Sequence, residues 1–478
     1  MEDVEKSGQT PSALRSGNAI DSASLSSQSI ENQNNSRSQN GPPDGGSGGP
    51  PPKKSIFHPD LKDQRKRIAI FFGRFYLITI VLLMGILSIY WGSLFKREEK
   101  MHKMRIAVVN WDGQNSTYLQ DNGLEAYVGS TVVNSLPEGV LGWEIRDDLN
   151  NSSIEHIRHL VHDRYYWGAV VIKANATEAL HRALTTADSS ANLTGIIEAM
   201  YEQATDITAT ESYVDPGMQT LRSIYEEKAL SAVFDPLLKS LNSTQKAEVV
   251  DNAPALLMPS TQFLISDNLP IDAIILFAPL QIGLIYLIIV SFFQVNMLMP
   301  IHGQTAPKIF GHHYVLYRQI TAQVSYFIIS LFFSLVSLAF QIDTSFTFGK
   351  SGFLVFWMVN FLGMSAVGGA NENMALLLFA YFPPALGFWL LFWVISNISP
   401  AFGPITLCAD FYRYGYAFPI YNVLELERVV LCNTTKRFMG RCFGVLVAWI
   451  VVNNLLMPIT LRINAKKMMQ RGPPGPPK

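Results

Sequence analysis

Hydrophobic residues along the chain are concentrated in six segments, each about as long as a bilayer is thick. A helix needs about 20 successive apolar residues to cross the hydrocarbon core of a membrane. The six segments lie at residues 75–95, 274–299, 320–342, 352–369, 375–395 and 443–461. This pattern predicts a polytopic α-helical membrane protein with six transmembrane helices, the last five of which form a membrane domain over residues 271–461.

The segment between the first two apolar stretches, residues 96–270, is hydrophilic and rich in potential glycosylation sites. Asn-x-Ser/Thr sequons begin there at Asn115, Asn150, Asn151, Asn175, Asn192 and Asn242, and elsewhere at Asn34, Asn397 and Asn433. Such a cluster indicates a surface that passes through the secretory lumen, although Asn, Ser and Thr are also simply common in this segment. We predict glycosylation at the six clustered sites and at Asn433.

The same hydrophilic segment carries the patterns of a folded domain. Residues 105–111 and 167–172 are continuous apolar runs typical of buried strands. Residues 154–165 and 196–241 have helical apolar spacing, which is interrupted in the second run by an Asp-Pro-Gly sequence at 215–217. We expect a mixed α/β extracellular domain between helices 1 and 2. The domain contains no cysteine, so its stability must come from a core.

Charges next to the apolar segments orient the chain. Basic residues flank the first segment on both sides, so the positive-inside rule hardly distinguishes the two orientations of this segment. The sequons decide the orientation. The loop 300–319 and the tail 462–478 are basic, which places them and both termini in the cytosol. Residues 1–60 are polar and predict a disordered cytosolic tail without a cleavable signal peptide. Residues 61–95 then form a basic juxtamembrane segment and helix 1.

Composition agrees with a membrane protein and argues against nucleic-acid binding. The 478 residues are 48% hydrophobic and 16% charged, whereas roughly a quarter of the residues in soluble domains are charged. The 37 basic and 38 acidic residues nearly cancel, so the total charge shows no footprint of a nucleic-acid partner. Three cysteines are too few for a scaffold built on disulfides.

Patterns of enzymes, cofactors and metals are missing or incomplete in the sequence. The Gly-Lys-Ser run at 349–351 lacks the glycine that a phosphate-binding loop needs five residues earlier, and neither HExxH nor GxSxG occurs. His156 and His159 share a helical face, but His162 lies about 120° from His156 around the helix. This spacing favours a solvated helix face over a metal site. We expect no enzyme activity and no cofactor. Any ATP-driven action requires a separate ATPase chain.

The segment 397–439 combines apolar residues with charges, prolines and tyrosines, which interrupt a full membrane crossing. A re-entrant or interfacial hairpin on the extracellular side fits this composition. Asp410 and Arg413 are spaced to pair on one helical face. They are either a charge pair of a translocation pathway at membrane depth or surface charges in the headgroup layer. Cys408 and Cys432 lie on the oxidising side, where they can form a disulfide.

Several of these stretches resemble one known family. They are the strand at 106–110 with its Asp-Gly turn, the Tyr-Trp-Gly-Ala-Val run at 166–170, and the Tyr-Glu-Gln-Ala run at 201–204. They are similar to the fungal nitrosoguanidine-resistance membrane protein family, a DUF3533-like group defined by a domain of unknown function. The likeness covers about residues 67–461. It implies a role in resistance to toxic compounds at the plasma membrane and assigns no catalytic residue.

More distantly, the order of one span, a large external domain and five spans resembles phage-infection-type proteins and ABC-2 permeases. Two hypotheses follow. The first is a permease-like protein that exports amphipathic compounds or alters the distribution of lipids and amphiphiles across the bilayer, with membrane lipid and such compounds as partners. The second is a non-transporting regulator or scaffold whose extracellular domain binds partners. A homo-oligomer is compatible with both hypotheses, and a continuous polar path through the helices favours the first.

Overall fold

The computed structural model describes residues 54–114, 116–271 and 273–471. Most of the predicted disordered tail, the predicted glycosylation site Asn115 and the sequon at Asn34 therefore lie outside the described residues, as do residues 472–478.

The chain divides into two compact units, Met1–Ile70 and Phe71–Lys478. The described part of the first contains a 3-10 turn at Pro59–Leu61 and the beginning of the first long helix, α1 (Lys62–Leu94). The folded domain and all later membrane helices belong to the second unit.

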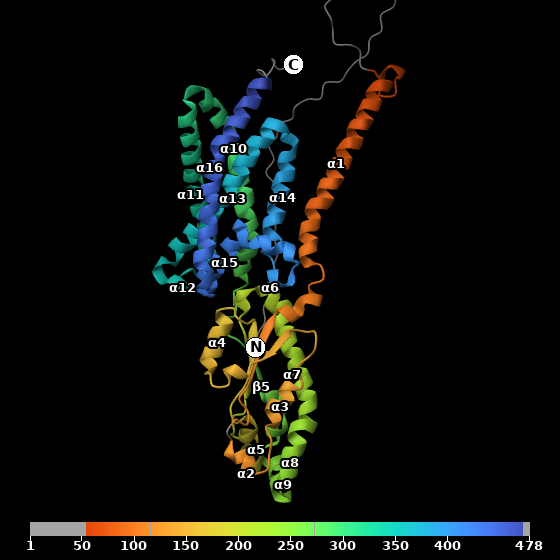
Figure 1. Cartoon of the computed structure of the whole chain (residues 1–478), viewed down its shortest axis with the longest axis vertical. Helices are drawn as coiled ribbons and strands as arrows, with labels where there is room; N and C mark the ends of the chain where they lie inside the picture. The colour runs from red at the N-terminus through yellow and green to blue at the C-terminus, as the bar shows by residue number, and fades with distance from the viewer. Residues whose placement is uncertain (1–53, 115, 272, 472–478) are drawn as a thin grey trace, which may run out of the picture. The chain divides into compact units, whose positions relative to one another are not determined.

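Residues 105–267 form a mixed α/β domain on a five-stranded sheet, as the sequence predicts (Figure 1). The strands, in the order β2-β1-β3-β4-β5 across the sheet, are β1 (Arg105–Asn110), β2 (Gly142–Ile145), β3 (Gly168–Ile172), β4 (Ile197–Tyr201) and β5 (Phe263–Asp267). All neighbouring pairs are parallel except β3 and β4, which are antiparallel.

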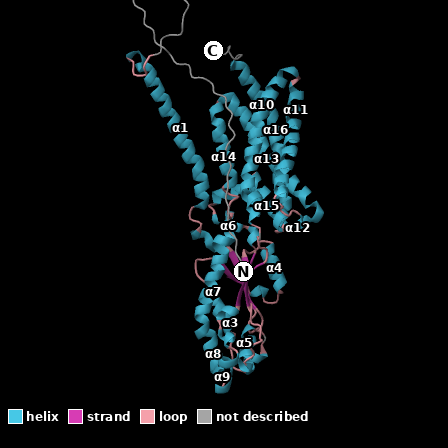
Figure 2. Ribbon diagram, turned by 180° about the vertical axis from the view of Figure 1, so that it is seen from behind, coloured by secondary structure: helices cyan, strands magenta, loops and turns pink. Residues whose placement is uncertain are grey.

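The sheet is buried on both faces, which explains why β1 and β3 are continuous apolar runs. Ile106 and Val108 of β1 face one core together with helices α3 (Tyr127–Val133), α5 (Ala176–Thr186) and α7 (Asp215–Ala229). Ala107 and Val109 face a second core under helix α4 (Ile154–His162). The strands lie between these helices in Figure 2. The alternation follows from the two-residue repeat of a strand.

Helices make up most of the rest of this domain. They are α2 (Thr117–Asp121), α3 (Tyr127–Val133), α4 (Ile154–His162), α5 (Ala176–Thr186), α6 (Ile207–Ala209), α7 (Asp215–Ala229), α8 (Asp235–Ser240) and α9 (Ser243–Asn252). The helix predicted over 154–165 is confirmed by α4.

The prediction of one helical pattern over 196–241 is wrong at two points. Residues 197–201 form β4, because their backbone pairs with that of β3 in the sheet. Residues 207–240 are then helical without the predicted interruption at 215–217. A π-helical turn at Thr210–Val214 precedes Asp215-Pro216, and another at Leu230–Phe234 precedes Asp235-Pro236. Such turns accommodate the missing proline N–H within a continuing helix.

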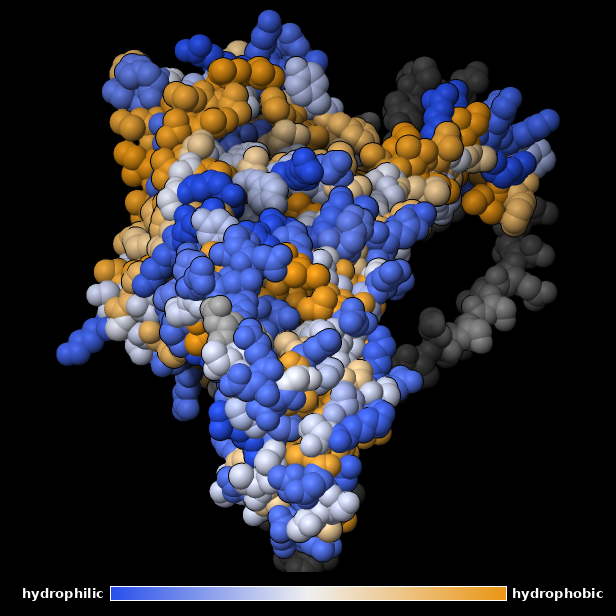
Figure 3. Space-filling model, turned by 60° about the horizontal axis from the view of Figure 1, so that its bottom comes forward, coloured by the Kyte–Doolittle hydropathy of each residue, from blue (hydrophilic) through white to orange (hydrophobic). Residues whose placement is uncertain are grey.

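Among the described residues, five helices are long and apolar enough to span a bilayer: Pro59–Leu94, Ile274–Lys308, Gly311–Ala339, Ser345–Tyr381 and Lys436–Gln470. Their main α-helical segments are α1, α10 (Leu284–Thr305), α11 (Gly311–Ala339), α13 (Gly352–Tyr381) and α16 (Met439–Arg471). The segment Pro383–Ile398, which includes α14 (Leu386–Ile398), is apolar but shorter. Hydrophobic side chains gather over these helices in Figure 3, whereas the folded domain exposes mainly hydrophilic ones.

The boundary predicted between the fourth and fifth apolar segments is wrong. Residues 370–374 do not form a loop, because α13 continues through them and ends at Tyr381. The turn comes at Phe382, followed by Pro383 and Pro384, which cannot continue the helix. The polar residues at 371–373 remain helical because they contact neighbouring helices.

Helix α13 packs against α10, α11 and α16. A side chain at Gly368 would meet the ring of Tyr326 on α11, and one at Gly369 would meet Asn453 on α16. Both Gly368 and Gly369 are buried. Small residues here let the helix backbones approach closely, which is how helices associate in membranes.

The predicted hairpin 397–439 contains the helix α15 (Pro419–Cys432) besides its turns. The four-residue helix α12 (Ser345–Phe348) packs beside α15 from outside the segment. Every α15 residue except Tyr421 is buried. Helix α15 lies at the end of the bundle that meets the folded domain (Figure 1). The segment is therefore a packed element of the protein interior, and its charged residues need partners there.

Candidate functional site

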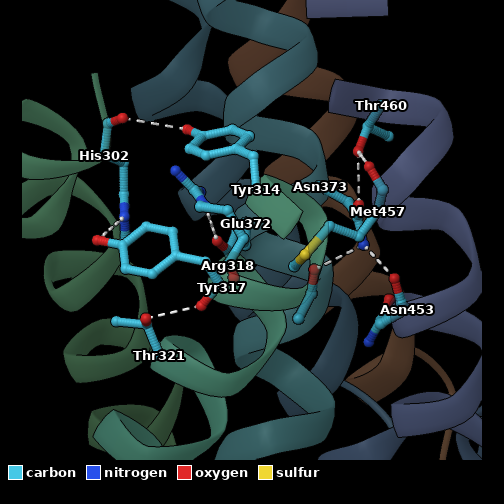
Figure 4. Close-up of polar contacts among 11 residues, drawn as sticks. His302, Tyr314, Tyr317, Arg318, Thr321, Glu372, Asn373, Asn453, Met457 and Thr460 are labelled. Carbon is cyan, nitrogen blue, oxygen red and sulfur yellow. Dashed lines mark hydrogen bonds and ion pairs between the residues drawn. The ribbon is translucent and has the colours of Figure 1, made fainter. Parts of the chain in front are cut away.

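A buried ion pair joins two membrane helices. Arg318 of α11 is 1% exposed and Glu372 of α13 is 3% exposed. Arg318 Nε donates a hydrogen bond of 3.0 Å to Glu372 Oε1, and the Arg318 Nη2 group donates to the same oxygen (Figure 4). Ionisable side chains inside a membrane domain are costly and are retained mainly where they pair or serve a function.

Glu372 is the middle of three consecutive polar residues on α13 that contact different neighbours. Asn371 Nδ2 donates to Ser291 Oγ of α10 at 3.0 Å, and Asn371 Oδ1 accepts from Trp389 Nε1 of α14 at 3.1 Å. Successive residues of a helix point about 100° apart. One short polar run can therefore connect α13 to several helices around it.

Asn373 completes this arrangement on the side of α16. Its Nδ2 donates to the carbonyl oxygen of Asn453 at 3.0 Å, and its Oδ1 accepts from Thr460 Oγ1 at 2.8 Å (Figure 4). Asn453 Nδ2 in turn donates to the Ala366 carbonyl at 2.9 Å. The amides are thus satisfied by helix–helix hydrogen bonds, the usual role of such groups in membranes.

The ion pair, unlike the amides, keeps polar atoms without partners. Among the described residues, Arg318 Nη1, Glu372 Oε2 and the Tyr326 hydroxyl are buried without a hydrogen-bond partner. Tyr326 lies on α11, eight residues after Arg318, and is fully buried. Buried polar atoms without a partner are expensive, and such exceptions are frequent at functional sites. This centre can accept a polar group that enters the bundle.

Two tyrosines and a histidine extend the polar region from Arg318 toward the loop between α10 and α11. His302 Nδ1 lies 3.2 Å from the Tyr317 hydroxyl, and the Tyr314 hydroxyl donates to the His302 carbonyl at 3.3 Å. Figure 4 shows His302 and both tyrosines near the Arg318 pair.

A second polar centre lies where the folded domain contacts α15. Glu425 accepts from Arg164 Nη1 of the folded domain at 2.5 Å and from Arg428 Nη1, one turn along α15, at 3.2 Å. Arg428 Nη2 also lies 3.4 Å from Asp206 Oδ2 of the folded domain. A cavity of about 290 Å³ adjoins these four residues.

The hydroxyl of Thr435, which follows α15, strengthens the same junction. Thr435 Oγ1 donates to Asp163 Oδ1 at 3.0 Å, and Arg437 Nη1 donates to the Asp163 carbonyl at 3.2 Å. Ion pairs and hydrogen bonds between residues far apart in the sequence therefore hold the folded domain to the end of the bundle.

The candidate pair Asp410 and Arg413 forms, but it is not buried. Arg413 Nη2 lies 2.9 Å from Asp410 Oδ1, and the side chains of Arg413 and Asp410 are 70% and 77% exposed, respectively. The buried charges of the segment are instead on α15. Glu427 is 1% exposed, and its Oε2 has no partner in the part of the chain that the structure describes.

The disulfide suggested between Cys408 and Cys432 is absent, since both are free thiols. Cys408 Sγ lies 3.3 Å from the Ser93 carbonyl and 3.8 Å from Arg97 Nη2, at the end of α1. Cys432 is the last residue of α15.

The predicted glycosylation sites differ in exposure. Asn151, Asn175, Asn192 and Asn242 are exposed, whereas Asn150 and Asn433 are half-buried. The further sequon residue Asn397 is fully buried, and its Oδ1 accepts from the Ile420 N–H at 3.3 Å.

The three histidines of α4 are not brought together as a metal site. His156 and His159 are exposed, and His162 Nδ1 lies 3.0 Å from Glu202 Oε1. Within the described ranges, no group of three or more potential metal ligands is found.

The apolar pattern of the sequence misses the membrane ion pair because it places both residues in loops. Arg318 falls in the predicted loop 300–319, and Glu372 falls between two predicted spans. The sequence holds one usable signal, since a spanning helix continued through residues 370–374 would place an acidic residue inside the bundle and require a basic partner.

The family is shown by comparison with known proteins. Residues 75–455 match the model of the DUF3533 family, described as a protein of unknown function. The chain is also 31% identical over 433 residues to the uncharacterized endoplasmic reticulum membrane protein YJR015W of Saccharomyces cerevisiae, covering 87% of this chain and 84% of that protein. No solved structure matches the chain. With five long apolar helices in the part that the structure describes, the chain is a multi-pass membrane protein, and it belongs to the DUF3533 family.

Proposed function

We propose that this protein is a permease-like membrane protein that exports amphipathic compounds or alters the distribution of lipids and amphiphiles across the bilayer. Such an activity would contribute to resistance to toxic compounds. In this proposal the chain crosses the membrane six times, with α14 and the turns after it forming the fifth crossing. Both termini are cytosolic and the α/β domain is extracellular or luminal.

The observation that carries the proposal is the Arg318–Glu372 pair. It lies between α11 and α13 and leaves one donor and one acceptor without partners among the described residues. A purely structural pair gains most when all of its polar atoms are satisfied. Unsatisfied polar atoms inside a helix bundle are instead suited to a polar group that passes between the helices.

The compartment is part of the proposal. The yeast relative is named as an endoplasmic reticulum membrane protein, whereas resistance to external compounds favours the plasma membrane. The exposed sequons fit either compartment, because both lie along the secretory pathway. We retain the plasma membrane, and we propose no enzymatic activity. Any energy from ATP would come from a separate chain.

The second candidate is a non-transporting regulator or scaffold whose folded domain binds partners. The observation that favours it is the hydrogen bonding of Asn371 and Asn373, which connects α13 to its neighbours. The side-chain amide nitrogen of each residue donates a hydrogen bond to another helix. A bundle held in this way can serve solely to anchor the folded domain.

The test is transport by the purified full-length protein in liposomes. One assay measures exchange of a fluorescent phospholipid between leaflets, and the other measures exit of an amphipathic dye along its own gradient. The proposal expects movement above that of protein-free liposomes. Glu372→Gln should reduce this movement, whereas Asp410→Asn, at an exposed ion pair, should not. A parent protein that moves neither probe would reject the permease and retain the scaffold.

A further inference from the structure

The cavity at the junction of the folded domain and the bundle is lined by residues from distant parts of the chain. Its basic residues are Arg164, which follows α4, Arg428 on α15 and Arg441 near the start of α16. Its acidic residues are Asp206 and Glu425. Three guanidinium groups and two carboxylates leave one positive charge in excess.

The two carboxylates do not satisfy all the hydrogen-bond donors of the guanidinium groups. Arg428 is 7% exposed, and its Nε has no hydrogen-bond partner among the described residues. The same holds for Arg164 Nε. Buried donors of this kind normally have an acceptor, which is either protein or a bound group. They are the second observation, besides the charge excess, that indicates an anionic ligand.

Arg441 lies at the accessible side of the cavity. It is exposed, and within the described residues it forms no ion pair. Its guanidinium carbon lies 4.9 Å from the ring centroid of Phe438 and 5.4 Å from that of Tyr416, so aromatic rings position it. It is the third residue of α16, close to the end of that membrane helix. A headgroup at the membrane surface can therefore reach it.

We propose that this cavity binds a phosphoryl oxyanion, carried by a phospholipid headgroup or free in solution. Arginine forks match phosphate oxygens, and one excess positive charge matches the single negative charge of a phosphodiester. The cavity volume of about 290 Å³ lies at the lower end of the volumes of ligand pockets, which are usually about 300–1,000 Å³. A cavity of this size suits a headgroup and excludes the acyl chains. Binding here requires no movement across the bilayer, so the inference is independent of the transport proposal.

The experiment measures thermal unfolding of the full-length protein in a neutral detergent at fixed detergent concentration. The probes are a short-chain phosphatidylglycerol, a diacylglycerol with the same chains and no phosphate, and inorganic phosphate. A ligand that binds only the folded state raises the unfolding temperature with a saturable dependence on its concentration. We expect such a rise with phosphatidylglycerol, with inorganic phosphate, or with both, and none with diacylglycerol.

Variants locate the site. Arg441→Gln removes one charge-assisted contact at an exposed residue and should weaken the apparent affinity about tenfold. Arg413→Gln removes an exposed arginine outside the cavity and should bind as the parent does. Stabilisation by phosphatidylglycerol alone identifies the headgroup as the source, and equal stabilisation by phosphate identifies the free anion. The inference is overturned if neither phosphate probe stabilises the parent, if diacylglycerol acts as strongly, or if Arg441→Gln binds like the parent.

Discussion

Arg164 and Glu425 lie 261 residues apart in the sequence, yet Arg164 Nη1 is 2.5 Å from Glu425 Oε2. Arg164 ends the turn after α4 with a positive φ of 58°, and Glu425 lies in the middle of α15. Their side chains are 17% and 5% exposed. This pair connects the folded domain directly to the membrane domain.

The first prediction concerns this connection. Glu425→Gln leaves both Arg164 and Arg428 without their shared carboxylate, and breaking such a buried pair typically costs about 3–5 kcal/mol. We expect a lower unfolding temperature and faster proteolysis at the junction. Glu155→Gln is the matched control, since Glu155 pairs with Arg158 at an exposed position, where a pair contributes about 0–1 kcal/mol. Equal behaviour of the two variants would contradict the structural role of Glu425.

The second prediction compares two ion pairs in single and double variants. Arg318→Gln or Glu372→Gln alone leaves a buried charge unpaired, and each should lower the yield of folded protein strongly. The double variant should be milder than either single one, because neither charge remains. Yield of monodisperse protein and unfolding temperature are the measurements.

The exposed pair Asp410 and Arg413 provides the comparison for the second prediction. Asp410→Asn, Arg413→Gln and the double variant should all stay within about 1 kcal/mol of the parent. A double variant at Arg318 and Glu372 that is as unstable as the single ones would show that the two charges act separately.

The third prediction is a stability maximum set by two histidines of the folded domain. The hydrogen bond that His162 donates to the Glu202 carboxylate raises the pKa of His162 above its ordinary value of 6.5, with Asp163 adding to the shift and burial and Arg164 opposing it. The stability that protonated His162 gives the folded state is fully present below pH 6.5 and is lost as pH rises through the raised pKa. His162→Gln should flatten the loss of stability on the alkaline side.

His181 acts in the opposite direction. Burial between the Tyr118 hydroxyl and Ser240 Oγ, each 2.9 Å away, lowers its pKa below 6.5, and Arg182 adds to the shift. Its neutral form is favoured, so stability is present above pH 6.5 and is lost as pH falls through the lowered pKa. His181→Gln should flatten the acid side in unfolding curves measured across pH. If the two variants exchange these effects, the assignment is wrong.

The fourth prediction concerns the side of the membrane that the folded domain faces. Asn151, Asn175, Asn192 and Asn242 are exposed and should carry glycans in protein from its native host. Removal of N-linked glycans should increase gel mobility, and each Asn→Gln substitution should remove one step. Protein whose mobility does not change after glycosidase treatment would contradict the proposed orientation.

The sequence alone predicts the parts of this protein that depend on local pattern. Continuous apolar runs identify β1 and β3, and helical spacing identifies α4. Five of the six predicted apolar segments fall on the five long helices of the described residues, whereas the segment 375–395 is divided between α13 and α14. These features follow from backbone hydrogen bonding and from the repeat of each element, which neighbouring residues determine. The strand β4 is not identified by such patterns, because its five residues, Ile197–Tyr201, are too few to distinguish a strand from a helix by period.

The tertiary structure alone decides where the charges lie. Asp410 and Arg413 are neighbours in sequence and pair at an exposed site, as local spacing permits. Arg318 finds its partner 54 residues away, and Arg164 finds its own on another domain. The free energy of a buried charge depends on the partner that packing places beside it, and that partner comes from a distant part of the chain. A local pattern can show that a buried charge needs a partner, but it does not say which residue the partner is, so the pairs of both candidate sites are visible only in the folded protein.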